Sequence, residues 1–372
     1  MQQQERLHAL DTVRAFALLA GIVLHAAMSF MPGLAAFGFP ADSSQSPALQ
    51  TAFYVIHVFR MPLFFFLAGY FAHLTFHRKG AAGFMRDRAR RIALPMVVGW
   101  VFFGPLAMMG VYLAFGPEVT GTPPPAGGFP LSHLWFLYYL LLIYAATISA
   151  RALVVRVLDR NGHVRTAVDT LVRYAVNSHV APVLLAVPIA VCLYFTPNWI
   201  PWGGIPTPDT GLMPQLPAMI GYGTAFAFGW LMHRQFDFLT RWQRGWILHV
   251  IAAIALTAAS LWLAERAPNP IAIDPAIKAA CAVCYALAAW NWVFGLIGAS
   301  LRFFSRENAA RRYLADASYW MYLAHLPLVF ALQLVVLKWP LHWSIKFPLI
   351  VGTAVAILLL TYHFFARNTF IG

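Results

Sequence analysis

Charged side chains are scarce in this chain. Asp, Glu, Lys and Arg make up 10% of the 372 residues, whereas a soluble domain usually carries about 25%. Hydrophobic residues make up 60%, and the mean hydropathy is +0.67. This shortage excludes an ordinary soluble domain. It predicts an all-α, polytopic membrane helix bundle, because several apolar runs reach the roughly 20 residues that cross a bilayer as a helix.

Cysteine is also scarce, with three residues in the chain. Cys281 and Cys284 form a Cys-x-x-Cys inside an apolar run, and no second Cys or His pair lies nearby. We therefore predict no metal site and interpret these thiols as small buried hydrophobic groups. No internal repeat, low-complexity stretch or appended soluble domain is evident. Residues 1–372 are predicted to form a single membrane-embedded domain.

About ten apolar segments predict transmembrane helices. These segments are 11–31, 51–76, 92–115, 133–150, 180–196, 216–233, 246–264, 277–298, 316–337 and 345–366. Pro62 lies in the second segment and is expected to kink its helix and free a carbonyl. The Pro/Gly-rich stretches 116–132 and 197–215 are expected to be loops or re-entrant segments.

Connections between the predicted spans alternate between those with few or no Lys and Arg and those rich in them. The loops 32–50, 116–132 and 197–215 contain none, whereas 77–91 holds six and 151–179 holds five. This alternation is the positive-inside pattern, and it predicts that both termini are cytosolic. The basic residues expected on the outer side are Arg266, Lys278, Lys338 and Lys346.

The net charge of +13 therefore reflects mostly topology. It argues against nucleic acid as a partner and favours contact with anionic lipid headgroups. The basic connection 151–179 is mildly amphipathic and is expected to lie on the cytosolic face of the membrane.

A few ionisable residues fall within or at the ends of the predicted spans. They are Asp11, Arg14, His25, His57, Arg60, His133 and His325. Such a residue costs at least about 2.5–3.5 kcal/mol inside a membrane, so it usually faces a bundle interior or a wet cavity. We therefore treat this set as the candidate functional residues.

Three of these residues share one face of the first helix. At roughly 100° per residue, Asp11, Arg14 and His25 lie in line, with a rise of roughly 16 Å from Arg14 to His25. Gly21 lies along the same stripe and would let another group approach the backbone closely. The stripe predicts one wall of a tunnel that begins at the cytosolic surface. The alternative is a structural pairing of Asp11 with Arg14 and a hydrogen bond from His25 to a carbonyl.

Two further polar sites are expected near the membrane midplane. Arg60 lies at about the depth of His25, and its permanent charge requires either a backbone carbonyl at a broken helix or an anionic partner. His325 lies at a similar depth in the ninth segment. Tyr322 and Ser318 precede it and form a polar face with it.

Other candidates lie toward the two membrane surfaces. His133 and Trp135 begin the fourth segment at the outer surface, where an aromatic belt is the alternative to substrate contact. His57, one turn above Arg60, is expected to pack locally or to contact a substrate. Arg88 and Arg91 share a face at i, i+3 and suit bidentate capture of phosphates. The alternative for them is ordinary positive-inside charge.

Together these patches resemble the acyltransferase family 3 membrane proteins. LDTVRAFALLAGIVLH carries the family's spacing of Arg, ten residues and His, at Arg14 and His25. RARR carries its Arg-x-x-Arg, at Arg88 and Arg91. HVFRMPLFFFLAGYF, SHLWFL and ASYWMYLAHLPL resemble spans two, four and nine of the branch involved in glucan biosynthesis. Ala15, where the broader family often has Gly, also fits that branch.

The resemblance implies a membrane-bound O-acyltransferase of the bacterial inner membrane. It would transfer a succinyl group from cytosolic succinyl-CoA to hydroxyls of osmoregulated periplasmic glucans. Some relatives carry a C-terminal esterase-like domain; without one, the membrane domain itself is expected to complete the transfer.

The stripe and the resemblance together assign roles to the candidate residues. The catalytic set is His25, Arg60 and His325, and the donor-binding set is Arg14, Gly21, Arg88, Arg91, Ser318 and Tyr322. The acceptor-binding set is His57, His133 and Trp135. Asp11 would pair with Arg14, and no metal is required.

Several alternatives remain open at this stage. His25 could act as a general base or form a covalent acyl-histidine. The same chemistry could use acetyl-CoA and another polysaccharide or a small-molecule acceptor. A transporter or flippase without acyl chemistry would also place Arg and His inside the membrane.

Overall fold

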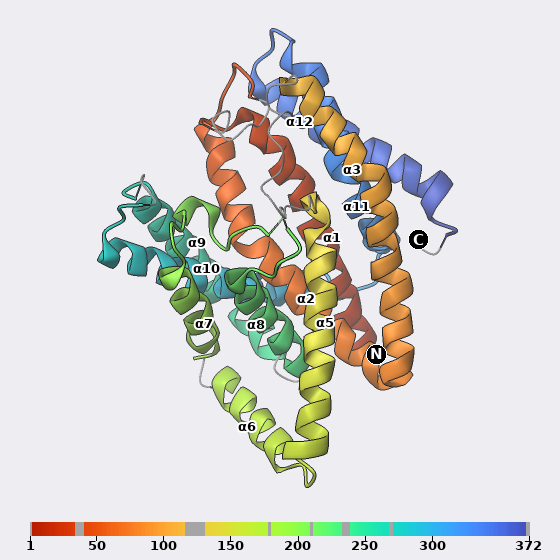
Figure 1. Cartoon of the computed structure of the whole chain (residues 1–372), viewed down its shortest axis with the longest axis vertical. Helices are drawn as coiled ribbons and strands as arrows, with labels where there is room; N and C mark the ends of the chain where they lie inside the picture. The colour runs from red at the N-terminus through yellow and green to blue at the C-terminus, as the bar shows by residue number, and fades with distance from the viewer. Residues whose placement is uncertain are drawn as a thin grey trace.

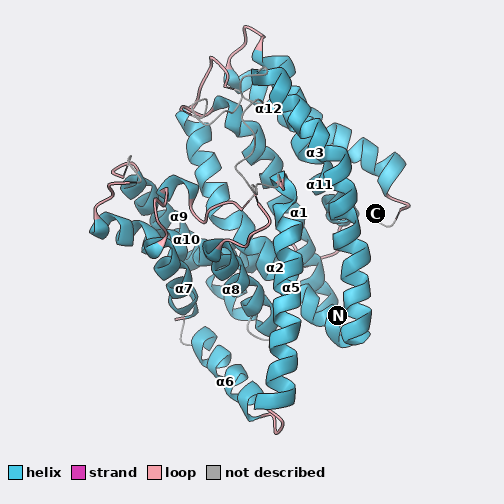
Figure 2. Cartoon of the chain, viewed as in Figure 1, coloured by secondary structure: helices cyan, strands magenta, loops and turns pink. Residues whose placement is uncertain are grey.

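The computed structural model describes residues 2–33, 41–115, 131–177, 180–208, 211–232, 239–267 and 271–369. These residues are predominantly α-helical, and no β-strand occurs among them (Figure 2). The prediction of an all-α fold is thus confirmed. The helices are α1 (Gln2–Ala27), α2 (Pro47–Arg88), α3 (Leu94–Phe115), α5 (Trp135–Leu153), α6 (His163–Asn177), α7 (Ala181–Phe195), α8 (Leu216–Met232), α9 (Leu239–Ala264), α10 (Pro275–Phe303), α11 (Ala309–Leu337) and α12 (Trp343–Thr361).

Short helical segments extend or join these helices. They are η1 (Met28–Phe30), η3 (Ala89–Ala93), η4 (Ser132–Leu134), η5 (Val154–Leu158), η6 (Pro201–Gly203) and η8 (Tyr362–Ala366). Three of them, η3, η5 and η8, are single π-helical turns. Such turns are rare and often occur at functional sites.

Seven helical runs of the described chain are long and apolar enough to cross a membrane. They are His8–Phe30, Pro47–Leu106, Ser132–Leu158, Leu239–Ala264, Pro275–Phe303, Ala309–Leu337 and Trp343–Ala366, and α6 with α7 would add an eighth. The predicted span 51–76 and the first part of the predicted span 92–115 lie in the single 60-residue run Pro47–Leu106. The helices α7, of 15 residues, and α8, of 17, are shorter than a typical span. The protein is therefore a multi-pass membrane protein, and a total of ten transmembrane spans stays a prediction.

The long helix α2 contains both a proline and a break at a glycine. Ser46 caps its start by accepting a hydrogen bond from the backbone N–H of Leu49. Pro62 lies inside the helix, and a kink there stays a prediction; the non-helical residue is Gly80, with φ 67° and ψ 178°. Glycine adopts positive φ without the steric cost that a Cβ brings. The chain beyond Gly80 continues through η3 into α3, which runs back along the bundle (Figure 1).

Two hydrophobic clusters hold the bundle together. The larger one includes residues of α2, α5, α8 and α10, and the smaller one joins α1, α11 and α12 (Figure 1). Within the larger cluster, the backbones of α2 and α8 nearly touch. A Cβ at Gly69 would lie 2.0 Å from the carbonyl oxygen of Phe226, and a Cβ at Gly229 would lie 2.0 Å from that of Phe66. Small residues commonly permit such close helix contacts in membranes.

Two of the basic residues expected on the outer side have specific partners. The Nζ of Lys346 lies 2.7 Å from Asp42 Oδ2, and both residues are buried. The Nζ of Lys278 donates to the carbonyl of Thr196 at 2.8 Å. Lys346 therefore joins the segment before α2 to α12, and Lys278 joins α10 to the segment after α7.

The amphipathic connection contains α6, which lies at one end of the molecule in Figure 1. Val172 and Val176 on one face of α6 are buried. At the turn before α6, Asp159 accepts hydrogen bonds from the backbone N–H groups of Val164 and Arg165. The position of α6 on the cytosolic membrane surface stays a prediction.

Candidate active site

A cavity of about 1580 Å³ runs between α1, α2, α5 and α11 and reaches the segment 196–217. Its lining on α2 before the break at Gly80 extends from Gln50 to Phe71, a rise of roughly 32 Å. That rise is close to the roughly 30 Å thickness of the hydrocarbon core. The volume exceeds the roughly 300–1,000 Å³ of most small-molecule sites, so the cavity has room for a long ligand or for two substrates.

Most of the predicted site residues line this one cavity. They are Arg14, Gly21, His25, His57, Arg60, Arg88, Arg91, His133, Trp135, Ser318, Tyr322 and His325. Asp11 is not among them: it lines a separate pocket of about 420 Å³, and its Oδ1 lies 3.3 Å from Arg14 Nη1. The fold therefore brings together candidates from distant parts of the chain, and the roles assigned to them stay predictions.

Three imidazoles lie in sequence along the cavity wall. The ring centroids of His25 and His325 are 5.2 Å apart, and those of His325 and His133 are 5.4 Å apart. The Nδ1 of His325 lies 2.6 Å from the carbonyl oxygen of Tyr322. Because a carbonyl only accepts, this nitrogen carries the proton and Nε2 keeps its lone pair. His325 can therefore accept a proton or a hydrogen bond on the side away from its helix.

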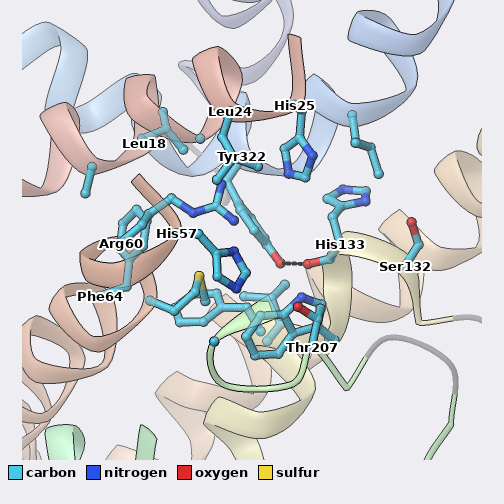
Figure 3. A pocket seen from close by; sticks show the side chains of 18 of the residues that line it. Leu18, Leu24, His25, His57, Arg60, Phe64, Ser132, His133, Thr207 and Tyr322 are labelled. Atoms are coloured by element: carbon cyan, nitrogen blue, oxygen red, sulfur yellow. Dashed lines mark hydrogen bonds between the residues drawn. The ribbon is translucent and has the colours of Figure 1, made fainter. Parts of the chain in front are cut away.

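His133 is attached to α11 by hydrogen bonds at both its ring and its backbone. The Nε2 of His133 donates to the carbonyl of Leu323 at 2.9 Å, and the backbone carbonyl of His133 accepts a hydrogen bond from the Tyr322 hydroxyl at 2.5 Å (Figure 3). Its Nδ1 is buried and has no hydrogen-bond partner within the described chain. His133 is 8% exposed. The structure places it beside His325 in the wall and joins the start of α5 to α11.

His25 lies near the end of α1, at the start of the imidazole row. Its carbonyl accepts a hydrogen bond from Gln333 Nε2 at 2.9 Å, which satisfies one of the free carbonyls in the last helical turn. Its Nδ1 is buried, and no described residue bonds to it. Figure 3 shows the His25 ring on the same cavity wall as Tyr322 and His133.

Arg60 extends into the cavity from α2 (Figure 3). No carboxylate of the described residues forms an ion pair with it, and its Nε is buried without a hydrogen bond. A Cβ at Gly21 would lie 2.6 Å from Arg60 Nη1. The absence of a Cβ at Gly21 therefore makes room for this guanidinium. Gly21 lies on the face of α1 that was predicted to bind the acyl donor. Since Arg stays charged, the cavity contains a positive charge that no described carboxylate balances.

One end of the cavity is cationic. Arg14 Nη2 donates to the carbonyl of Ala315 at 3.0 Å. Arg88 lies 2.6 Å from Asp87, and its guanidinium lies 5.6 Å from the ring centroid of Tyr144. Arg91 lies 3.6 Å from Asp87, with its side chain 70% exposed. Arg88 is thus held in place, whereas Arg91 is accessible to solvent.

The remaining predicted residues are mostly buried in the wall. The Ser318 hydroxyl donates to the carbonyl of Ala315 at 2.6 Å. Trp135 is 6% exposed and packs against Phe65 and Tyr222. His57 Nε2 donates to the carbonyl of Gly203, in the segment after α7, and its ring lines the cavity.

Sequence reasoning missed two groups of lining residues. Asp316 and Tyr319 on α11 line the cavity, and the Tyr319 hydroxyl is buried without a partner in the described chain. They precede Tyr322 and His325 at intervals of three, so helical spacing was a signal that could have found them. The other group lies in 196–217, where a Pro- and Gly-rich stretch offers no comparable periodic signal.

The helical membrane fold and the row of basic side chains in its cavity define a polytopic membrane protein with an internal polar site. The chain belongs to the acyltransferase family 3, since the acyltransferase domain that defines this family matches residues 7–363. The family predicted from the motifs is thus confirmed, and family membership supports acyl transfer as the chemistry.

The chain is also similar to the Glucans biosynthesis protein C of Salmonella paratyphi B, Salmonella heidelberg and Salmonella schwarzengrund. Each is 27% identical over 156 residues, which cover 39% of this chain and 38% of the relative. The alignment thus spans less than two fifths of these relatives. No solved structure matches the chain.

Proposed function

We propose that this protein transfers a succinyl group from cytosolic succinyl-CoA to a hydroxyl of a periplasmic glucan. Family membership supports the acyl transfer, and the name of the Salmonella relatives supports a role in glucan biosynthesis. The observation that carries the choice of acyl group is Arg60, a cation in the cavity without a carboxylate partner among the described residues. A succinyl group brings a distal carboxylate, whereas an acetyl group does not.

The direction of transfer rests on the proposed topology. With ten spans in the bacterial inner membrane and both termini in the cytosol, the end of the cavity at Arg14, Arg88 and Arg91 faces the cytosol. Guanidinium groups bind phosphates in bidentate fashion, so this end would hold the nucleotide part of the donor. Segment 196–217 would face the periplasm, from which the acceptor would enter.

The residues near the middle of the cavity would carry out the transfer. His25 would accept the proton of the sugar hydroxyl as that oxygen bonds to the thioester carbon. The C–S bond then breaks, and His25 returns the proton to the departing CoA thiolate. His325, with its free Nε2 lone pair, would orient the His25 ring. In the covalent alternative, His25 itself takes up the acyl group and passes it to the hydroxyl.

Arg60 would hold the distal carboxylate and so place the thioester carbon within reach of His25. Removing one partner of a buried, hydrogen-bonded charge pair costs about 2–5 kcal/mol, or roughly 30-fold and more in rate. Arg60→Gln is therefore expected to reduce succinyl transfer by about 30-fold or more and to affect acetyl transfer far less. The measurement is mass spectrometry of a glucan incubated with succinyl-CoA or acetyl-CoA and equal amounts of purified protein.

Two other variants calibrate this experiment. His25→Ala should abolish transfer from both donors, because loss of a general base typically costs 10²–10⁴-fold. His163→Ala, at an exposed position on α6, should leave both transfers unchanged. Equal loss of succinyl and acetyl transfer in Arg60→Gln would instead assign Arg60 to the oxyanion. Wild-type protein without acyl transfer from either donor would contradict the proposed function.

A further inference from the structure

The two ends of the cavity differ in charge. The described lining residues within 196–207, together with Gln215, Pro217 and those of the first three turns of α2, include no Asp, Glu, Lys or Arg. The opposite end contains Arg14, Arg88, Arg91 and Asp316. An anionic ligand would be stabilised at the cationic end and would find no counter-charge at the neutral end. The neutral end is therefore suited to an uncharged polar ligand.

Uncharged polar side chains line the neutral end. Gln50, Asn198, Thr207 and Gln215 contribute to its wall, and none of their side-chain groups makes a hydrogen bond within the described chain. Each amide offers two donors and one acceptor, and the hydroxyl offers both functions. This combination matches adjacent hydroxyl groups, which also donate and accept.

An aromatic side chain supplies an apolar surface next to these groups. Trp202, in η6, lines the cavity and contacts the ring of Tyr54 edge-on, with centroids 5.2 Å apart. The carbonyl of the next residue, Gly203, accepts the hydrogen bond of His57 Nε2 at 2.9 Å. An indole combines a broad apolar face with low conformational freedom. Here α2 contacts the ring through Tyr54 and the adjacent backbone through His57.

The segment that carries Trp202 is fixed in a specific conformation. Gly204 has φ 54°, and a Cβ there would lie 2.4 Å from the Tyr285 ring. The indole Nε1 of Trp199 donates to the Gly204 carbonyl at 2.6 Å. Asn198 also has a positive φ, 49°, which is uncommon for a residue other than glycine. Such conformations persist where the surrounding contacts enforce them, so this wall is preformed.

We propose that this neutral end is a subsite for a neutral carbohydrate, with Trp202 stacking on a sugar ring and Gln50 and Gln215 bonding its hydroxyls. His57 lies three residues from Arg60 on α2, a rise of roughly 4.5 Å. A sugar bound at Trp202 therefore lies next to the position proposed for the acyl group. The inference rests on the proposed function for the sugar's role as acceptor, whereas sugar binding itself can be measured without any acyl donor.

The test measures binding of a neutral β-glucan oligosaccharide to the purified full-length protein by isothermal titration calorimetry, without donor. Trp202→Ala is expected to weaken binding at least tenfold, and Trp202→Phe should recover most of the loss because it restores an aromatic face. Trp262→Ala is the matched control, since Trp262 is 54% exposed and outside the cavity lining. A glucan of the same size that carries carboxylates should bind no more tightly than the neutral one.

Three results would overturn this assignment. They are no binding of the oligosaccharide to the wild type, equal affinity in Trp202→Ala and wild type, and tighter binding of the carboxylated glucan. A parallel assay with succinyl-CoA separates the two proposals. Trp202→Ala should raise the acceptor KM at least tenfold and leave CoA binding unchanged. Sugar binding that depends on Trp202, in a protein without acyl transfer, would support the subsite and contradict the proposed function.

Discussion

At the scale of single residues, Gly21 and Arg60 form a pair that neither residue suggests alone. The sequence shows that Gly21 lies on the face of Arg14 and His25, and that Arg60 lies at about the same depth. Only the fold shows that the guanidinium occupies the space above Gly21. A residue with a Cβ at position 21 must displace that charge.

Gly21→Ala is accordingly expected to impair transfer while leaving the fold intact. The new methyl group would lie 2.6 Å from Arg60 Nη1, and such overpacking costs about 1–3 kcal/mol. The displaced group is the end of a flexible side chain, so we expect Arg60 to move rather than the helices. Succinyl transfer should then decrease tenfold or more. The thermal midpoint should change little, since alanine also favours the helix by about 1 kcal/mol.

Gly352→Ala on α12 is the matched control for this substitution. No heavy atom lies within 4 Å of a Cβ built at that glycine, so transfer should match the wild type. The thermal midpoint should stay the same or rise slightly, because alanine favours the helix. Full succinyl transfer in Gly21→Ala would show that the guanidinium does not need its present position.

At the scale of helices, α2 and α8 depend on two glycines at their crossing. A Cβ at Gly229 would lie 2.0 Å from the carbonyl oxygen of Phe66, and a backbone atom cannot move aside alone as a side chain can. The two helices would have to separate. Because α2 also carries His57 and Arg60, that separation would alter the cavity as well as the stability.

Gly229→Ala is therefore expected to destabilise the protein by about 1–3 kcal/mol or more. Gly223→Ala on the same helix is the matched control for the close helix contact, because a Cβ at position 223 has no heavy atom within 4 Å. The measurement is the thermal unfolding midpoint of each variant in detergent. Equal midpoints for the two variants would mean that the close contact between α2 and α8 does not limit stability.

At the scale of the whole molecule, the charge difference between the cavity ends matches the charge alternation of the connections. Arg88 and Arg91 belong to the basic connection 77–91, whereas segment 196–217 contains no Lys or Arg. The positive-inside rule orients the cavity end at Arg88 and Arg91 toward the cytosol. The cavity would then lead from a cationic cytosolic end to a neutral periplasmic end.

Reporter fusions test this orientation. Green fluorescent protein fused to either terminus should fluoresce, and alkaline phosphatase fused there should be inactive, because the latter folds only outside the cytosol. Phosphatase inserted after residue 207 should be active. A fluorescent fusion at the N-terminus together with an active phosphatase at the C-terminus would place the termini on opposite sides. That result would contradict an even number of spans, and with it the proposal of ten.

The membrane-embedded helical fold, the family and most of the polar residues in the cavity could be predicted from the sequence. These features are local: an apolar run of sufficient length specifies a helix in a bilayer, and an ionisable residue within it is costly enough to indicate function. Contacts in the folded protein were needed to reveal the break at Gly80, the partner of Gly21, the tautomers of the histidines and the wall around Trp202. They depend on contacts between segments far apart in the chain, and helical periodicity says nothing about which faces of different helices meet.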